Sequence, residues 1–187
     1  MSHTLASQYG RPGFLERSPC TRAALDYADE RHAGQRREAD GAPFVLHPLE
    51  VARLLHDCGY PDHVIAAGVL HDVIEDTDAK RDDLEQRFGR QVAELVAALT
   101  DDPTIEDQAE RKAALRVQVA RAGEEAAVVF AADKVSKARE LRMRAGQAAL
   151  DERAATKLEH YEQSLEMLSE LLPGHALVEQ LRSELRH

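Results

Sequence analysis

The sequence is poor in the residues that favour sheets. Tryptophan is absent, and phenylalanine and tyrosine occur only four times each in 187 residues. Aromatic and β-branched residues favour strands, whereas Ala, Leu, Glu and Arg favour helices, so this composition favours a helical protein. Hydrophobic residues still make up 43% of the chain. A chain of this length and composition can bury one sizeable core.

Cysteine is scarce, and long apolar runs are absent. Cys20 and Cys58 give neither a disulfide framework nor the ligand spacing of a zinc knuckle. No run approaches the roughly 18 apolar residues of a membrane span, and the polar N-terminus has no secretory hydrophobic region. We therefore expect a protein of the reducing cytoplasm.

Positive charge is in deficit. The 24 Lys and Arg residues face 34 Asp and Glu residues, which gives a formal net charge of −10. Such a balance argues against a general binder of nucleic acid or of an acidic membrane. A small anionic substrate needs only a local cationic pocket and is not excluded. The oligomeric state is left open.

The spacing of apolar residues predicts an all-α fold, because they recur at three- and four-residue steps along most of the chain. Residues 1–17 are expected to form a flexible N-terminal arm, and residues 18–187 a single domain. The apolar segment 126–135 leaves a strand open on its own pattern, but its neighbours all read as helices. Helices are expected at 19–34, up to Gly59, from Pro61-Asp62 onward, and at about 80–88, 91–100, 105–121, 151–171 and 175–186.

The most informative segment carries His71-Asp72 and, two residues later, Glu75-Asp76. These four ionisable groups lie in an otherwise apolar stretch. Burying an unpaired charge costs several kcal/mol, so such a cluster needs compensation. A divalent metal ion provides it, because it binds neutral imidazole and carboxylate together. On a continuous helix, Glu75 would lie one turn beyond His71, and Asp76 one turn beyond Asp72.

Two ligands leave a metal ion under-coordinated, so further ligands are expected elsewhere in the chain. His47 lies in an apolar Phe-Val-Leu-His-Pro entry to a helix, and Asp133 follows seven uncharged, mostly apolar residues. Two imidazoles and two carboxylates suit Mn²⁺ or Fe²⁺, with Zn²⁺ as an alternative, rather than all-oxygen Ca²⁺ or Mg²⁺ coordination. Taken singly, each residue has an ordinary explanation: a core histidine for His47, and a salt bridge with Lys134 for Asp133.

The remaining histidines are interpreted differently. His32 falls on the packed face of its helix, where it would serve as a core histidine or support the metal ligands. The others have no partner in the sequence pattern and are expected at the surface: His56, His63, His160 and His175.

The order of these motifs resembles the HD phosphohydrolase superfamily and, more narrowly, the hydrolase domain of RelA/SpoT enzymes and stand-alone small alarmone hydrolases. The resemblance spans about residues 22–140. It rests on His47-Pro48, His71-Asp72, Glu75-Asp76-Thr77, Ala132-Asp133-Lys134 and the Gly-Gln-Arg loop at 34–36. It implies a helical HD fold around a buried Mn²⁺ ion held by His47, His71, Asp72 and Asp133, with Glu75 and Asp76 activating the water.

The implied substrate is (p)ppGpp, whose 3′-pyrophosphate would be removed to leave GDP or GTP. Arg37 is the first candidate to bind its phosphates. Arg36, Lys137 and Lys157 are further candidates, and Tyr161 resembles a family position that reaches the nucleotide. Spacing alone places Tyr161 in the core.

Two positions depart from the family pattern. Glu38 stands where the family commonly has a lysine, and Lys137 stands where it commonly has an asparagine. Three alternatives therefore stay open: hydrolysis of another nucleotide, such as the 2′-phosphate of NADPH; a metal-retaining nucleotide sensor; and a structural helical module without metal. An intact Glu75-Asp76 pair argues against a sensor, which needs no water activator.

Overall fold

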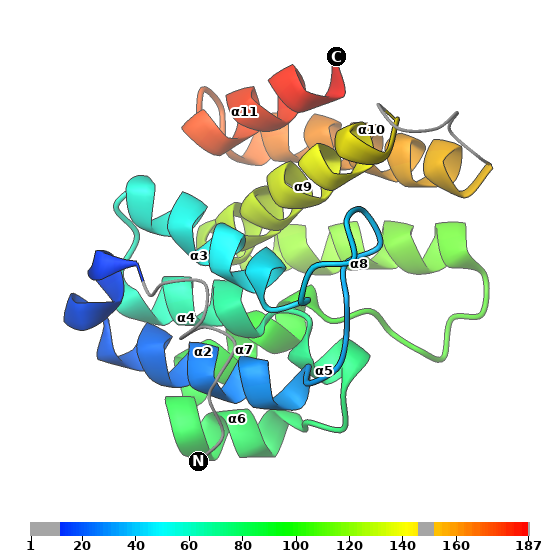
Figure 1. The fold of residues 1–187 in the computed structure, drawn as a ribbon. Coiled ribbons are helices and arrows are strands. Elements are labelled where there is room, and N and C mark those ends of the chain that lie inside the picture. The colour runs from blue at the N-terminus through cyan, green and yellow to red at the C-terminus, as the bar shows by residue number, and fades with distance from the viewer. Residues whose placement is uncertain (1–11, 146–151, 187) are drawn as a thin grey trace. The chain divides into compact units, whose positions relative to one another are not determined.

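The computed structural model describes residues 12–145 and 152–186, and within these ranges it contains helices and no strand (Figure 1). One isolated bridge joins Arg36 and Pro43. The all-α prediction is therefore confirmed for the described residues, and the segment 126–135 is helical. The structure groups into two compact units, Met1–Thr100 and Asp101–His187.

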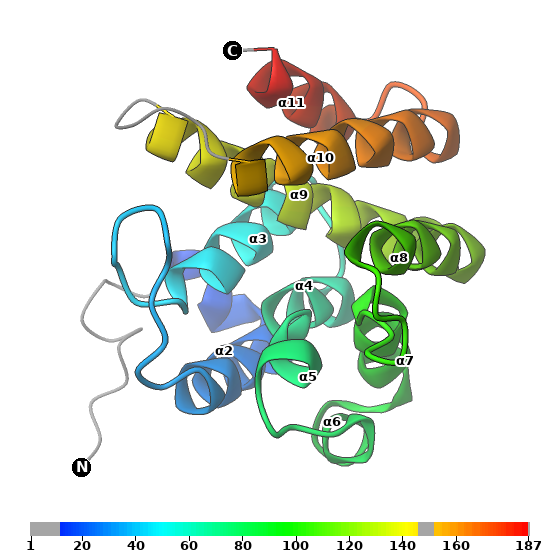
Figure 2. The same cartoon turned by 90° about the vertical axis from the view of Figure 1, so that its right-hand side faces the viewer.

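The first unit is built around helix α4, which packs against α2, α3 and α7, while α6 packs on α7 (Figure 2). Every residue of α4 from Val64 to Leu70 is buried, as is typical of a central helix that is apolar nearly all round. The unit contains a 3₁₀ helix η1 (Gly13–Arg17) and helices α2 (Pro19–Arg31), α3 (Leu46–Asp57), α4 (Asp62–Leu70), α5 (Val73–Asp76), α6 (Arg81–Phe88) and α7 (Arg90–Leu99).

The first turn of α2 is capped from α4 rather than from its own N-cap residue. Pro19 begins the helix as predicted, but the Ser18 side chain makes no capping hydrogen bond. The Asp62 carboxylate accepts hydrogen bonds from the backbone amides of Cys20 and Thr21, both at 2.9 Å, and from Thr21 Oγ1 at 2.6 Å. An acidic side chain at a helix N-terminus satisfies amides that lack an intrahelical partner. This capping fixes the two helices against each other.

A glycine lets α4 approach α3 closely. A Cβ atom at Gly68 would lie 2.5 Å from Leu55 Cδ1 and 3.2 Å from Val51 Cγ1, so a larger residue would push the helices apart. The close approach matters for the site, because α3 carries His47 and α4 leads directly into His71.

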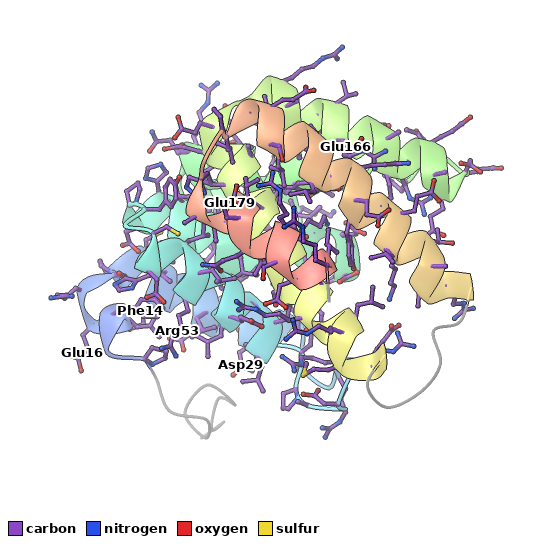
Figure 3. The ribbon with its side chains drawn as sticks, turned by 90° about the horizontal axis from the view of Figure 1, so that it is seen from above. Phe14, Glu16, Asp29, Arg53, Glu166 and Glu179 are labelled. Carbon is purple, nitrogen blue, oxygen red and sulfur yellow. The ribbon has the colours of Figure 1, made fainter. Side chains whose placement is uncertain are left out.

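The described part of the segment before α2 contains the 3₁₀ helix η1. Residues 1–11 of the predicted arm lie outside the described residues. Of the rest, η1 buries Leu15 to 2% exposure, and the Phe14 ring stacks on His56 at 4.5 Å between ring centroids. Glu16 points outward (Figure 3). The flexibility of the arm, residues 1–17, stays a prediction.

The second unit is arranged around its longest helix, α9, which packs against α8, α10 and α11 (Figure 2). Residues 126–136 of α9 are all buried. Along α10, Tyr161 and Leu168 are buried, while Glu166 on α10 and Glu179 on α11 are exposed (Figure 3). The helices are α8 (Gln108–Ala122), α9 (Glu124–Ala145), α10 (Glu152–Leu171) and α11 (Ala176–Leu185). Among the described helices, none combines the length and apolarity that crossing a membrane requires.

Candidate metal centre

The His71-Asp72 pair lies in a turn between α4 and α5, not inside a continuous helix. Helix α4 ends at Leu70 and α5 begins at Val73, which corrects the expectation of one helix through the whole segment. The backbone leaves regular α geometry at Asp72, with φ −92° and ψ −6°. The Asp76 amide nevertheless donates to the Asp72 carbonyl at 2.9 Å, so the one-turn relation between these two residues is kept.

Three predicted ligands of the first unit meet at this turn. His47 Nε2 lies 3.3 Å from His71 Nε2. Asp72 Oδ2 lies 3.0 Å from His71 Nε2 and 3.5 Å from His47 Nε2. All three residues are buried, with exposures of 2% for His47, 4% for His71 and 8% for Asp72. This cluster of His47, His71 and Asp72 is called the His-Asp cluster below.

The hydrogen bonding of His71 fits a metal ligand. His71 Nδ1 lies 2.8 Å from the Gly68 carbonyl oxygen, which accepts, so Nδ1 carries the proton. In a neutral ring, Nε2 then presents a lone pair toward the His47 ring and the Asp72 carboxylate. A bound cation would accept these lone pairs and remove the repulsion between them. In metal-binding histidines, the ring nitrogen that does not bind the ion commonly donates its proton to a backbone carbonyl. The residues present therefore fit a divalent ion.

His32 lies buried beside this cluster, as expected for a core histidine. Its exposure is 4%, and its ring packs on Phe44 at 4.5 Å between centroids. His32 Nδ1 lies 2.7 Å from Gln35 Oε1, and Gln35 Nε2 donates to the Asp76 carbonyl at 3.0 Å. Burial lowers the pKa of His32, which favours the neutral ring.

The two predicted catalytic carboxylates are exposed, although the His71-Asp72-Val73 segment shortly before them is buried. Glu75 and Asp76 form the last turn of α5, directly after Asp72. Solvent-facing carboxylates beside a buried ligand cluster can meet a substrate that arrives from solution. The position of both residues is compatible with acid–base chemistry at an ion in the cluster.

Asp133 belongs to the second unit, on α9. Its side chain is buried, with Lys134 Nζ at 2.7 Å from Oδ2 and Lys137 Nζ at 3.0 Å from Oδ1. Lys134 Nζ also lies 4.3 Å from the centroid of the Phe130 ring. Burial lowers the pKa of the Lys134 ammonium, and the Asp133 carboxylate opposes that shift. The salt bridge that the sequence left open for Asp133 is thus present.

The predicted phosphate-binding arginines are held within their own loop. Arg37 makes a two-point ion pair with Asp40, at 3.2 Å for Nε to Oδ1 and 2.6 Å for Nη2 to Oδ2. This pair lowers the pKa of Asp40. Arg36 Nη1 donates to the Gly41 carbonyl at 2.8 Å. Sequence reasoning missed Asp40, although its place three residues after Arg37 was a usable signal.

The other predicted substrate residues lie in the second unit. Lys137 contacts Asp133, as described above, and Lys157 on α10 is half-buried. Tyr161 is 6% exposed, with Lys134 Nζ at 5.9 Å from its ring centroid. Its burial agrees with the core position that the spacing alone indicated.

The surface interpretation of His160 is wrong. Arg116 Nη1 lies 2.7 Å from His160 Nδ1, and the imidazole packs against the rings of Phe130 and Tyr161. Burial, and next the nearby Lys134 ammonium, lower the pKa of His160 to about 2. Its neighbours Arg116, Phe130 and Lys134 come from other helices, which the local pattern around His160 does not reveal. Of the other histidines read as surface, His175 caps α11 by accepting from the Leu177 amide at 3.1 Å.

The helical fold and the buried His-Asp cluster define a helical protein with a candidate divalent-metal site. Residues 24–158, most of the sequence, match the family described as HD domain. The chain therefore belongs to the HD domain family.

Two proteins similar to this chain carry the same activity in their names. The human guanosine-3′,5′-bis(diphosphate) 3′-pyrophosphohydrolase MESH1 is 41% identical over 121 residues, which cover 63% of this chain and 67% of the human protein. The Aquifex aeolicus (strain VF5) guanosine-3′,5′-bis(diphosphate) 3′-pyrophosphohydrolase is 35% identical over 107 residues, which cover 57% of this chain but 15% of that longer protein.

A solved structure is similar over nearly the whole chain. It is described as a metazoan ortholog of SpoT that hydrolyzes ppGpp, and it matches with a TM-score of 0.79 and 31% identity. The match covers 90% of this chain and 95% of the other. A second structure, from Listeria monocytogenes EGD-e, matches with a TM-score of 0.69 and 27% identity, covering 78% of this chain and 97% of the other.

Proposed function

We propose that this protein is a metal-dependent (p)ppGpp 3′-pyrophosphohydrolase that releases pyrophosphate and leaves GDP or GTP. The observation that carries the proposal is the buried His-Asp cluster with the exposed Glu75-Asp76 pair directly after it. The names of the human and Aquifex relatives support the choice of substrate. The proposed location is the cytoplasm, because the composition provides no disulfide framework. The two cysteines, Cys20 and Cys58, are free thiols.

The ion would be held by His47, His71 and Asp72 of the first unit together with Asp133 of the second. Two imidazoles and two carboxylates suit Mn²⁺, with Fe²⁺ and Zn²⁺ as alternatives. When bound, such an ion supplies Lewis-acid polarisation of a phosphoryl oxygen and an acidified water. Asp133 is assigned by the family resemblance and by the burial of its carboxylate, which accepts from two ammonium groups.

The chain's own carboxylates would handle the proton. Glu75 and Asp76 are placed to accept a proton from the attacking water or to orient it, a role that contributes about 10²–10⁴-fold to rate. The roles of the two carboxylates are assigned as a pair, because both lie on the same exposed turn.

Cationic side chains would bind the phosphates. Arg37 is the first candidate, and its guanidinium is already oriented by two hydrogen bonds to the Asp40 carboxylate. The remaining candidates are Arg36, Lys137 and Lys157, with Tyr161 facing the base or sugar.

A second candidate function is hydrolysis of another nucleotide. Two positions at which this chain differs from the common family pattern favour it. Glu38, which is exposed, stands where the family commonly has a lysine. Lys137, which contacts Asp133, stands where the family commonly has an asparagine. The Lys137→Asn variant restores the common residue. A rise in ppGpp turnover relative to NADPH in this variant would assign Lys137 to substrate choice.

The test of the proposed function is product identification by ³¹P NMR. Purified protein, stripped of metal and reloaded with Mn²⁺, is incubated separately with ppGpp, pppGpp, NADPH and deoxynucleoside triphosphates. The proposal predicts pyrophosphate and GDP from ppGpp, and no turnover after chelation. Orthophosphate from NADPH, or turnover of a deoxynucleoside triphosphate alone, would establish the second candidate instead.

A further inference from the structure

Gln35 connects the loop after α2 to the turn that carries the catalytic carboxylates. We propose that Gln35, oriented by His32, is a positioning residue that fixes the Glu75-Asp76 turn for the reaction. The inference rests on the proposed function and deepens it, because neither residue is assigned a role there. The contact spans 41 positions of the sequence and lies within the first unit.

Helix α5 needs support from outside, because it is only four residues long. A single helical turn is not stable by itself, and its last carbonyls have no partners within the helix. Thr77 Oγ1 donates to the Val73 carbonyl at 2.5 Å and accepts from the Ala79 amide at 3.1 Å. Gln35 Nε2 donates to the Asp76 carbonyl at 3.0 Å. Local and distant side chains thus hold the end of α5 together.

The hydrogen bonds define which way the Gln35 amide faces. A carbonyl oxygen only accepts, so the group that reaches Asp76 is the amide NH₂. Gln35 Oε1 then accepts from His32 Nδ1, which must carry its proton. Burial of His32 keeps the ring neutral, so this arrangement costs no buried charge. The chain from His32 through Gln35 to Asp76 has a donor and an acceptor at each step.

The backbone of Gln35 is held on both sides. Its amide donates to the His32 carbonyl at 3.0 Å, and its carbonyl accepts from the Phe44 amide at 3.1 Å. The side chain therefore extends from a fixed point. Glutamate at this position would accept from His32, but its ionised carboxylate would meet the Asp76 carbonyl with no proton to donate.

A fixed Asp76 carbonyl matters because the reaction depends on geometry. A displacement of about 1 Å in a reacting group can lower the rate by about 10²-fold. The contact holds the backbone of Asp76 and, through it, the side chains of Glu75 and Asp76. It involves no metal ligand directly, so its loss should change the chemical step more than metal binding.

The test compares Gln35→Met with Gln86→Met in full-length protein. Methionine matches glutamine in length and removes both hydrogen bonds, while Gln86 lies exposed on α6. Three quantities are measured: kcat and KM for ppGpp, Mn²⁺ content, and hydrogen exchange at the amides of Asp76 and Ala79. Gln35→Glu serves as a second variant, since it keeps the size and the bond from His32.

The proposal predicts a 10- to 100-fold fall in kcat for Gln35→Met and Gln35→Glu, with little change in KM or Mn²⁺ content. Exchange at Asp76 and Ala79 should be faster than in the wild type, and Gln86→Met should behave as the wild type. Unchanged kcat and exchange in either Gln35 variant would overturn the proposal, as would loss of Mn²⁺ together with activity. Absence of ppGpp hydrolysis in the wild type would overturn the proposed function instead, while the exchange data would still decide the role of Gln35.

Discussion

Two buried charged groups in this protein differ in how their charge is balanced. In the His-Asp cluster, His47 Nε2, His71 Nε2 and Asp72 Oδ2 lie between 3.0 and 3.5 Å apart, so electron-pair donors face one another. On α9, the Asp133 carboxylate faces the ammonium groups of Lys134 and Lys137 at 2.7 and 3.0 Å. An added cation would stabilise the His-Asp cluster, whereas the Asp133 carboxylate is already paired with two ammonium groups.

This difference distinguishes a cluster of ligands that lacks a cation from a carboxylate that is already paired with side-chain cations. A buried carboxylate alone says little about function, because side-chain cations neutralise it in many proteins. Two imidazole nitrogens directed at each other beside a carboxylate fit a metal ligand set. We therefore propose the His-Asp cluster as the core of the metal site.

The largest effect is expected from breaking the His-Asp cluster. His71→Ala removes one imidazole ligand and should abolish both metal retention and ppGpp hydrolysis, because the activated water depends on the ion. Metal content by mass spectrometry and pyrophosphate release measure the two effects. His63→Ala, in helix α4 just before the His71-Asp72 turn, is the matched control. Retained turnover in His71→Ala would show that this cluster is not the metal site.

A large effect without metal loss is expected at Glu75. Glu75→Ala should keep the ion and lose roughly 10²–10⁴-fold in kcat, the usual contribution of a positioned acid–base group. Asp78→Asn provides the control, since Asp78 is an exposed carboxylate three residues later that pairs with Arg31 at 2.9 Å. Loss of the ion in Glu75→Ala would instead make Glu75 a ligand.

Substitution of Asp133 should lower the free energy of unfolding of the protein even when no metal ion is bound. Asp133→Asn leaves the buried Lys134 ammonium without its carboxylate, and removing one partner of a buried ion pair costs about 3–5 kcal/mol. Urea unfolding of the metal-free protein measures this loss. The double variant Asp133→Asn with Lys134→Met should recover much of it. If the metal-free Asp133→Asn protein is as stable as the wild type, the claim that the buried ion pair of Asp133 stabilises the protein is wrong.

The smallest effect concerns pH. The pKa of His160 falls from 6.5 to about 2 on folding, through burial and the nearby Lys134 ammonium. Below pH 6.5 the unfolded chain therefore binds a proton that the folded chain does not, and stability falls as the pH falls from 6.5 toward 2. His160→Phe should reduce this slope between pH 6.5 and 5 in urea unfolding. An unchanged slope would contradict a buried, neutral His160.

The sequence predicted the residues of the site better than their backbone. The helical class, the central helix from Asp62 and the approach of His47 to His71-Asp72 all follow from apolar spacing and from the cost of burying charge. The break between α4 and α5 does not follow, because a local pattern of apolar residues continues through it.

Contacts between distant segments could not be predicted from the sequence. Asp62 caps α2 across about 40 positions, and Gln35 reaches Asp76 across 41. Polar side chains have many partners of similar energy, and only the packed fold selects one of them. The same reasoning accounts for His160, whose neighbours Arg116 and Phe130 come from other helices.

The most direct measurement is a Mn²⁺ titration of metal-free protein observed through its histidine side chains by ¹⁵N NMR. Paramagnetic Mn²⁺ broadens the resonances of all nuclei near it, most strongly those of the groups that bind it. We predict that the signals of His47 and His71 disappear together and at the lowest Mn²⁺ concentration, before those of His56, His63 and His175. Broadening that begins at another histidine, or none at one equivalent, would contradict a metal centre at the His-Asp cluster.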